Sequence, residues 1–195
     1  LRINLSPSVE ALCQLLRNAK MRPFIVGGKV RDTLTGHDSK DIDIEVFGAD
    51  LHHIVKLLHN ANLKADIYGD QFGVIKVSGK DLDEIDVSVP RRDNHAGVGH
   101  TGFVVSCDPH MTTREALSRR DFTINSMMVD PIAGVLIDPY GGERDLAEGI
   151  LRHTSDHFAE DPLRVLRGFQ LASRYGLHLE QETVHLCREI VKDFS

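Results

Sequence analysis

The spacing of apolar side chains in the first ninety residues switches between helical and strand-like periods. Apolar residues three and four positions apart predict an amphipathic helix, whereas strict alternation predicts a strand with one buried face. The pattern predicts a helix that begins at Ser6-Pro7, a strand at 24–26, a strand at 41–46, a helix at 51–61, and strands at 74–77 and 85–89. Helices and strands in this mixed order indicate an α/β (α+β) unit with a mixed sheet.

The pattern changes in the second half of the chain. Residues 90–110 are rich in Gly, His and Asp and lack periodicity, so we expect a long loop there. Thr112 and Glu115 have the spacing of a capping box for a short helix that ends near Arg119. Strand-like residues follow at 135–137. From Asp161 onward, apolar positions recur at helical spacing, which predicts a small all-helical segment distinct from the α/β part.

Size and composition fit one domain with a helical addition. The chain has 195 residues, of which 41% are hydrophobic, and this suits a globular fold with a core. No apolar run approaches the roughly 20 residues that span a bilayer, and the first residues lack a signal-peptide pattern, so we expect no membrane partner. Three scattered cysteines, Cys13, Cys107 and Cys187, favour a reducing, cytoplasmic setting over a disulfide framework.

The net charge of −6 restricts the choice of partner. Proteins that wrap nucleic acid usually carry a basic excess. Either RNA is therefore not the partner, or the surface that grips RNA lies mostly outside this chain.

Three carboxylates are candidates for metal binding. Asp41 and Asp43 are two positions apart, so on a strand they point to the same face, where a cation relieves their repulsion. Their hard oxygen ligands suit Mg²⁺. Asp86 lies between apolar residues of a second strand, and if the two strands are neighbours, three carboxylates converge as in a two-metal phosphoryl-transfer site. By itself, an Asp-x-Asp pattern on a strand edge is more often a solvated face.

Gly27 and Gly28 stand between a predicted buried strand and a predicted helix. Glycines at such a turn let the backbone approach a phosphate, and the helix N-terminus favours the negative charge. An ordinary strand-to-helix turn has the same sequence, and the motif is neither a P-loop nor GxGxxG.

Four segments together resemble the class II tRNA nucleotidyltransferase and bacterial poly(A) polymerase family. The segments are GGKVRDTLTG followed by DIDIEVFG, then RRDFTIN, LIDPYGG and EDPLRVLR, in family order between about Phe24 and Tyr175. The resemblance implies a nucleotidyltransferase head of the DNA polymerase β superfamily at 1–144 and a helical neck at 145–195. Nothing in the chain resembles the family's body and tail domains, so we expect a fragment whose missing parts supply most of the grip on RNA.

The resemblance also implies a role for each motif. Asp41 and Asp43 would bind the metals, and the strand pattern described above adds Asp86 as a third catalytic carboxylate. Gly28 and Arg31 would hold phosphates, Arg31 through its forked donors. The full set implied for nucleotide binding is Gly27, Gly28, Arg31, Arg120, Asp121, Asn125, Asp161, Arg164 and Arg167. Within it, Arg120 would pair with the triphosphate, and Asp121 and Asn125 would contact the ribose. Without the other motifs, the Arg-Arg-Asp sequence would be an equally good surface ion cluster.

Asp161 and Arg164 are implied to act as a protein template for the incoming base. A carboxylate can accept a hydrogen bond from the exocyclic amino group of C or A, and a guanidinium can donate to the ring acceptors beside it. GTP and UTP present a carbonyl where an amine is needed. Asp-Pro is also a good helix start, so Asp161 could serve only as a cap, although its two oxygens allow both roles.

The implied activity is addition of CMP and AMP, from CTP and ATP, to the 3′ end of tRNA, with Mg²⁺ as cofactor. A poly(A) polymerase, an A-adding enzyme and a CC-adding enzyme share these motifs, and a nucleotide-binding module without catalysis is the alternative from another class. The intact carboxylates argue against the last.

Two departures stand out: Gln170 replaces an arginine found in many family members, and the 90–110 segment contains His95, His100 and His110, which could bind metal but fit solvated loop residues better.

Overall fold

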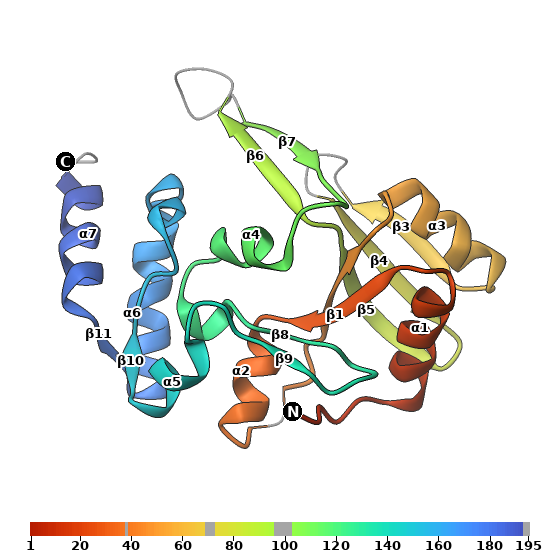
Figure 1. Ribbon diagram of the computed structural model, residues 1–195, viewed down its shortest axis with the longest axis horizontal. Coiled ribbons are helices and arrows are strands. Elements are labelled where there is room, and N and C mark those ends of the chain that lie inside the picture. The colour runs from red at the N-terminus through yellow and green to blue at the C-terminus, as the bar shows by residue number, and fades with distance from the viewer. Residues whose placement is uncertain (38, 69–72, 96–102, 193–195) are drawn as a thin grey trace.

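The chain folds into a seven-stranded mixed sheet with helices on both faces and a smaller, mainly helical unit at one end (Figure 1). The computed structural model describes residues 1–195 except 38, 69–72, 96–102 and 193–195. The elements that build the sheet and its first helices are α1 (Pro7–Asn18), β1 (Arg22–Val26), α2 (Gly28–Leu34), β2 (Asp43–Phe47), α3 (Leu51–Asn60), β3 (Lys64–Tyr68), β4 (Val74–Gly79), β5 (Leu82–Ser88), β8 (Met128–Val129) and β9 (Leu136–Ile137). The predicted α/β class is thereby confirmed.

The order of the strands places the chemistry-bearing segments at one end of the sheet. The order is β3-β4-β5-β2-β1-β8-β9, in which β2 and β5 are parallel and the other neighbours are antiparallel. Val26, the last residue of β1, lies opposite Asp43, the first residue of β2. Asp43 in turn lies beside Asp86 of β5. The glycines after β1 and the carboxylates of two further strands therefore meet at the same edge.

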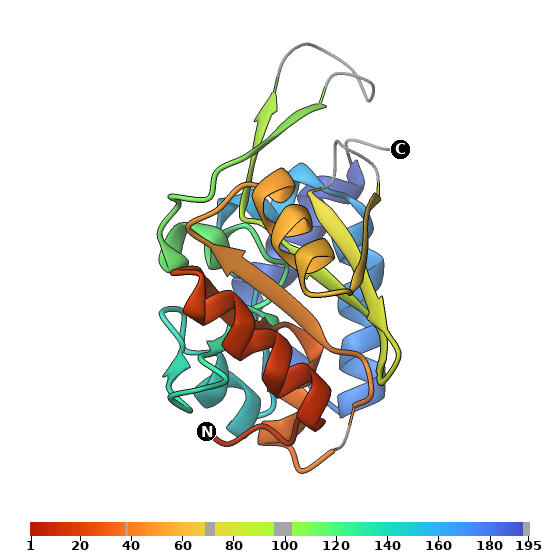
Figure 2. The same ribbon diagram turned by 90° about the vertical axis from the view of Figure 1, so that its right-hand side faces the viewer.

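The middle of the sheet is buried on both faces. Ile25, Ile44 and Val46 belong to the large core that α1 and α3 cover, and Figure 2 shows these two helices together in front of the sheet. Phe24 and Phe47 belong to a second core on the other face. Because side chains alternate along a strand, Asp43 and Glu45 of β2 share this second face, away from α1 and α3.

The second core is completed by α4 (Thr113–Ser118), which contributes Leu117 and Ala116. Its start has the predicted capping box: the Thr112 side chain accepts from the Glu115 backbone, and the Glu115 carboxylate accepts from the Thr112 backbone. At the other end of the chain, Ser6 caps α1 as expected, through its contact with the Val9 amide.

The prediction of a long loop at 90–110 is wrong. The chain there forms a β-hairpin of β6 (Arg91–His95) and β7 (Phe103–Cys107), which projects from the body of the protein in Figure 1. The first strand, RRDNH, is polar throughout, so a search for apolar alternation does not find it. The edge strand β3 was also not predicted from the sequence.

The C-terminal unit has its own core, built around two helices. Its elements are α5 (Gly142–Ala147), β10 (Ile150–Leu151), the 3₁₀ turn η2 (Asp156–Glu160), α6 (Leu163–Tyr175), β11 (His178–Leu179) and α7 (Gln181–Lys192). The helical pattern after Asp161 is confirmed as α6 and α7, joined by β11, which pairs with β10. Phe122 and Ile124, from the 3₁₀ turn η1 (Thr123–Asn125) and its start, pack into this core. The RRDFTIN segment therefore connects the sheet to the C-terminal helices.

None of the helices in the described part of the chain combines the length and apolar composition needed to cross a bilayer.

Candidate active-site cavity

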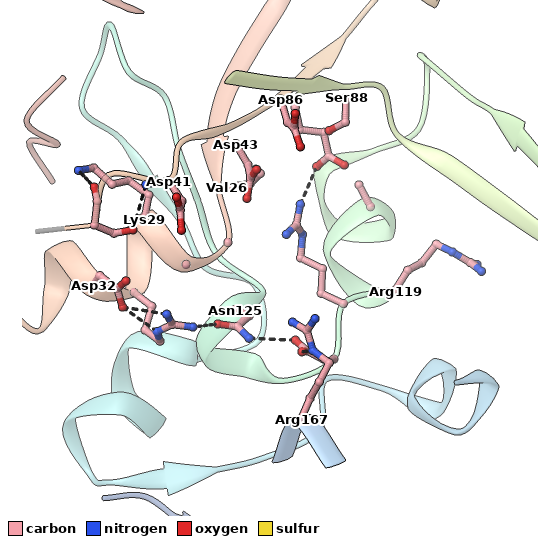
Figure 3. A pocket seen from close by; sticks show the side chains of 18 of the residues that line it. Val26, Lys29, Asp32, Asp41, Asp43, Asp86, Ser88, Arg119, Asn125 and Arg167 are labelled. Atoms are coloured by element: carbon pink, nitrogen blue, oxygen red, sulfur yellow. Dashed lines mark hydrogen bonds and ion pairs between the residues drawn. The ribbon is translucent and has the colours of Figure 1, made fainter. Parts of the chain in front are cut away.

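A cavity of about 710 Å³ lies between the edge of the sheet and helix α6. Every residue that the sequence singles out for catalysis or nucleotide binding lines it: Asp41, Asp43, Asp86, Gly27, Gly28, Arg31, Arg120, Asp121, Asn125, Asp161, Arg164 and Arg167. In Figure 3 the carboxylates of Asp41, Asp43 and Asp86 lie along one side, and Asn125 and Arg167 lie on the other. Three of the four family-like segments thus contribute to the walls of one site, and the LIDPYGG segment does not line it.

The acidic wall is built from two parallel strands and the residues before them. Asp43 begins β2 and Asp86 is its direct neighbour in β5, as the prediction required. Asp41 precedes β2 and is exposed to solvent. Asp86 already has a partner, because Lys76 of the next strand donates to it over 3.0 Å.

The electrostatics of this wall favour a cation. Asp43 is accessible to solvent, but the protein around it removes part of its hydration, and this desolvation raises the pKa of Asp43 above its ordinary value. Arg120 lowers the pKa again, whereas the neighbouring carboxylates raise it further. Glu45, two residues further along β2, is also buried, and the Arg120 guanidinium lies 3.6 Å from its Oε2. The wall therefore holds more carboxylates than the single arginine can neutralise.

The residues present fit a divalent metal in part. Asp41, two residues before the start of β2, and Asp43, the first residue of β2, are both exposed and both line the cavity. Their carboxylate oxygens are ligands of the type that hard cations prefer. Within the described residues, however, no three His, Cys, Asp or Glu side chains come together as a ready-made metal site. His110 is exposed, and the side chains of His95 and His100 lie outside the described residues. Asp41 and Asp43 are thus the residues that could hold a metal, with further ligands to come from a bound nucleotide.

The turn after β1 requires glycine. Gly27 has a φ of +69°, in the left-handed region that side chains other than glycine rarely adopt. A Cβ at Gly27 would also come within 3.3 Å of the Arg120 guanidinium and 3.8 Å of the Asp43 carboxylate. The absence of side chains here keeps the floor of the cavity open between an arginine and a carboxylate.

A chain of polar groups, of which Arg31, Asn125 and Asp121 are buried and Arg167 is exposed, forms the wall opposite the carboxylates. Arg31 donates through Nη1 to Oδ1 of Asn125 over 2.6 Å, and Nδ2 of Asn125 donates to Oδ1 of Asp121 over 3.1 Å. Nε of Arg167 then donates to Oδ2 of Asp121 over 2.9 Å. Figure 3 shows these contacts as dashed lines that follow one another along this wall of the cavity. Because each side chain fixes the next, the site is preorganised before any ligand enters.

The far end of this chain is anchored by Tyr175, the last residue of α6. Its hydroxyl accepts from Nη2 of Arg31 over 2.6 Å and donates to Oδ1 of Asp32 over 2.9 Å. The Arg31 guanidinium also lies 4.4 Å from the centre of the Tyr175 ring. Together with Arg167, this tyrosine attaches α6 to the sheet domain at two points, two turns apart.

Asp161 and Arg164 stand at the start of α6 with separate hydrogen-bond partners. Pro162 is the N-cap of α6, and Oδ1 of Asp161, one residue earlier, accepts from the amide of Leu163 over 2.9 Å while the residue also lines the cavity. The Arg164 guanidinium donates to two main-chain carbonyls, those of His157 (2.6 Å) and Arg119 (2.8 Å). Burial lowers the pKa of Arg164.

Sequence reasoning missed two residues of the site. Tyr175 and Glu45 both contact residues of the cavity wall. Glu45 could have been found, because it continues the alternation that begins at Asp41. Tyr175 gave no signal beyond helical spacing. Gln170, the departure from the family pattern, is exposed and is not among the described residues of the cavity wall.

Comparison with known proteins identifies relatives of this architecture. Residues 23–152 match the family described as the poly(A) polymerase head domain. The multifunctional CCA protein of Neisseria gonorrhoeae is 40% identical over 173 residues, which are 89% of this chain and 40% of that protein. The chain therefore spans about two fifths of the length of the curated relatives it matches.

Solved structures give the same picture. A CCA-adding enzyme in complex with ATP superposes with a TM-score of 0.76 at 29% identity, covering 97% of this chain and 43% of that one. The Bacillus stearothermophilus CCA-adding enzyme in complex with CTP superposes with a TM-score of 0.78 at 26% identity, covering 93% of this chain and 43% of that one.

Proposed function

This chain belongs to the poly(A) polymerase head-domain family, and we propose that it transfers CMP and AMP, from CTP and ATP, to the 3′ end of tRNA. Its fold is that of the DNA polymerase β-like nucleotidyltransferases, as the sequence motifs implied. We assign residues 1–144 to the catalytic head and 145–195 to the helical neck. The reaction belongs to tRNA maturation, which suits a cytoplasmic protein.

The proposal rests on one observation: carboxylates and arginine side chains line opposite sides of the same cavity. Asp41 and Asp43 would hold Mg²⁺ on the sheet side. The metal, when bound, supplies a positive centre that lowers the pKa of the attacking hydroxyl and neutralises the triphosphate. Asp86 lies beside Asp43 in the register and acts as the third carboxylate of this wall.

The nucleotide would lie across the cavity from the glycine turn to the start of α6. Gly27 and Gly28 leave room for the phosphates beside Arg120. Asp121 and Asn125, whose positions are fixed by their mutual hydrogen bond, would face the ribose. Arg31 and Arg167 hold these two residues in place, and each has guanidinium donors left for a phosphate.

Asp161 and Arg164 would read the base. Asp161 uses Oδ1 for its hydrogen bond with the Leu163 amide, which leaves Oδ2 to accept from the exocyclic amine of C or A. Arg164 keeps N–H groups beyond the two that its carbonyl partners use, and these can donate to the ring acceptor beside that amine. GTP and UTP would place a carbonyl against the Asp161 carboxylate, and this repulsion would exclude them.

The relatives support the choice of nucleotides. One solved relative holds ATP and another holds CTP, and the curated relative carries the name multifunctional CCA protein. Poly(A) polymerase, A-adding and CC-adding activities remain the alternatives within the same chemistry, and a binding module without catalysis is the alternative outside it.

Primer extension separates these functions. The chain is incubated, at high enzyme and RNA concentration because its binding to tRNA is expected to be weak, with Mg²⁺ and tRNA lacking one, two or three terminal nucleotides, with each NTP alone and with CTP and ATP together. The proposal expects CC addition from CTP and completion with ATP. AMP alone in long runs would indicate a poly(A) polymerase, and single AMP or CC products would indicate the partial activities. Tight NTP binding without any product, matched by Asp43→Asn, would indicate a binding module.

A further inference from the structure

The position of the Arg164 guanidinium depends on other segments of the chain. Within the described chain, its guanidinium is fixed by two main-chain carbonyls from different segments: Nη1 donates to His157 of η2, and Nη2 donates to Arg119 at the end of α4. The orientation of this guanidinium is therefore set by the distance and angle between those two segments. Anything that fixes η2 against α4 also fixes the direction in which the remaining Arg164 donors point.

The side chains of the same two residues are joined through Glu160. Nδ1 of His157 donates to Oε1 of Glu160 over 2.6 Å, and Nη2 of Arg119 contacts Oε2 of the same carboxylate over 3.2 Å. Arg119 and Glu160 are mostly buried, with 16% and 22% of their side chains exposed, whereas His157 is 37% exposed. One carboxylate thus bridges the two residues whose carbonyls hold Arg164.

We propose that His157 is a positioning residue for base selection, which acts on Arg164 by locking η2 through its contact with Glu160. This inference rests on the proposed role of Arg164 in reading the base. His157 lines no part of the described cavity wall and would touch neither substrate nor metal. Its effect passes through its own carbonyl, whose direction depends on the conformation of η2.

The contact between His157 and Glu160 adds to other attachments of η2. Ser155 is tied to the carbonyl of Ser118 at one end, and the Phe158 ring is buried in the C-terminal core. Between them, the Phe158 amide donates to the Ser155 carbonyl over 3.0 Å, and the His157 amide donates to the Ser155 hydroxyl over 3.2 Å. The 2.6 Å contact between His157 and Glu160 spans the rest of the turn.

The expected consequence is a loss of discrimination rather than a loss of binding. A guanidinium that is displaced by a fraction of an ångström still neutralises phosphate charge, but it no longer meets a ring acceptor in line. Loss of one well-aligned hydrogen bond corresponds to roughly a tenfold change in an equilibrium or rate ratio. We therefore expect about tenfold lower preference for CTP over UTP when the lock is removed.

A matched set of substitutions tests the geometry of the lock. His157→Ala removes the donor. His157→Asn keeps a donor at the position of Nδ1, whereas His157→Gln moves it to the position of Nε2, away from Glu160. Asp156→Ala is the control, because Asp156 lies on the same turn, is exposed, and contributes nothing to the described cavity wall.

Two measurements are made on each variant of the 195-residue chain with Mg²⁺: calorimetric affinities for CTP, ATP, UTP and GTP, and kcat and KM for each nucleotide in primer extension. The proposal expects His157→Ala and His157→Gln to lose about tenfold in the CTP/UTP ratio with CTP affinity and melting temperature little changed. It expects His157→Asn and Asp156→Ala to keep the wild-type ratio.

The outcomes separate this inference from the function on which it rests. Full discrimination in a folded His157→Ala overturns the positioning role. Equal losses in all three His157 variants, with lowered melting temperatures, indicate a structural role only and also overturn it. A wild-type chain that binds the four nucleotides equally refutes base reading by Arg164, and the positioning role falls with it. The calorimetric affinities for the four nucleotides test the positioning role of His157 even if the chain transfers no nucleotide to RNA.

Discussion

Tyr175→Phe should lower the free energy of unfolding by about 2 kcal/mol, because it removes a hydroxyl that serves two charged, buried groups. The hydroxyl accepts from Arg31 at 2.6 Å and donates to Asp32 at 2.9 Å, and these residues are only 7% and 6% exposed. Hydrogen bonds to charged groups contribute roughly 1.5–3 kcal/mol each. Arg31 keeps its 2.8 Å contact with Asp32, so about one of the two bonds is compensated. The ring of phenylalanine preserves the packing against the guanidinium.

Tyr140→Phe is the matched control. The Tyr140 hydroxyl also donates one hydrogen bond, to the carbonyl of Arg114 at 3.0 Å, and its ring also lies near a guanidinium. This contact is exposed, so water replaces the lost partner and the cost should stay below about 0.5 kcal/mol.

Thermal unfolding followed by circular dichroism measures both variants. At about 2–4 °C per kcal/mol for a chain of this size, Tyr175→Phe should melt roughly 4–8 °C below wild type and Tyr140→Phe within about 2 °C of it. CTP affinity should also fall in Tyr175→Phe, since Arg31 orients Asn125. Equal melting temperatures for the two variants would show that the polar chain contributes no more than an exposed contact, and the reasoning would be refuted.

Other substitutions test other parts of the site. Asp41→Ala or Asp43→Ala should abolish nucleotide transfer while the melting temperature stays within about 2 °C of wild type, since both carboxylates are exposed; near-normal turnover with Mg²⁺ would contradict the metal assignment. Arg164→Ala should relax discrimination against UTP and GTP by about tenfold or more, and unchanged preferences in primer extension would mean that it reads no base. Gly142→Ala should destabilise the chain by about 3 kcal/mol, because its Cβ would lie 2.1 Å from the Thr123 carbonyl oxygen; a wild-type denaturation midpoint would refute this. With a net charge of −6, the chain should bind tRNA weakly at physiological salt, and tight binding with a steep salt dependence would show that these 195 residues contain the main RNA site.

The sequence determined the local structure wherever a signal acts over a few residues. The capping box of Thr112 and Glu115 and the cap at Ser6 formed as predicted, because each hydrogen bond closes within one helical turn. Apolar spacing located the strands at the centre of the sheet, because burial imposes a period that can be counted. The β6–β7 hairpin broke this rule, since its first strand pairs with β7 although its sequence is polar throughout.

The motifs also indicated which residues gather in the cavity, but the sequence left open how they are held. Only the parallel pairing of β2 with β5 places Asp86 beside Asp43, and that register depends on the packing of the whole sheet. The hydrogen bond between Arg31 and Tyr175 joins residues 144 positions apart. No local period encodes such a contact, because it arises only when two separate cores have formed and brought their polar edges together. The tertiary structure therefore decided the geometry of the site, while the sequence by itself decided its chemistry.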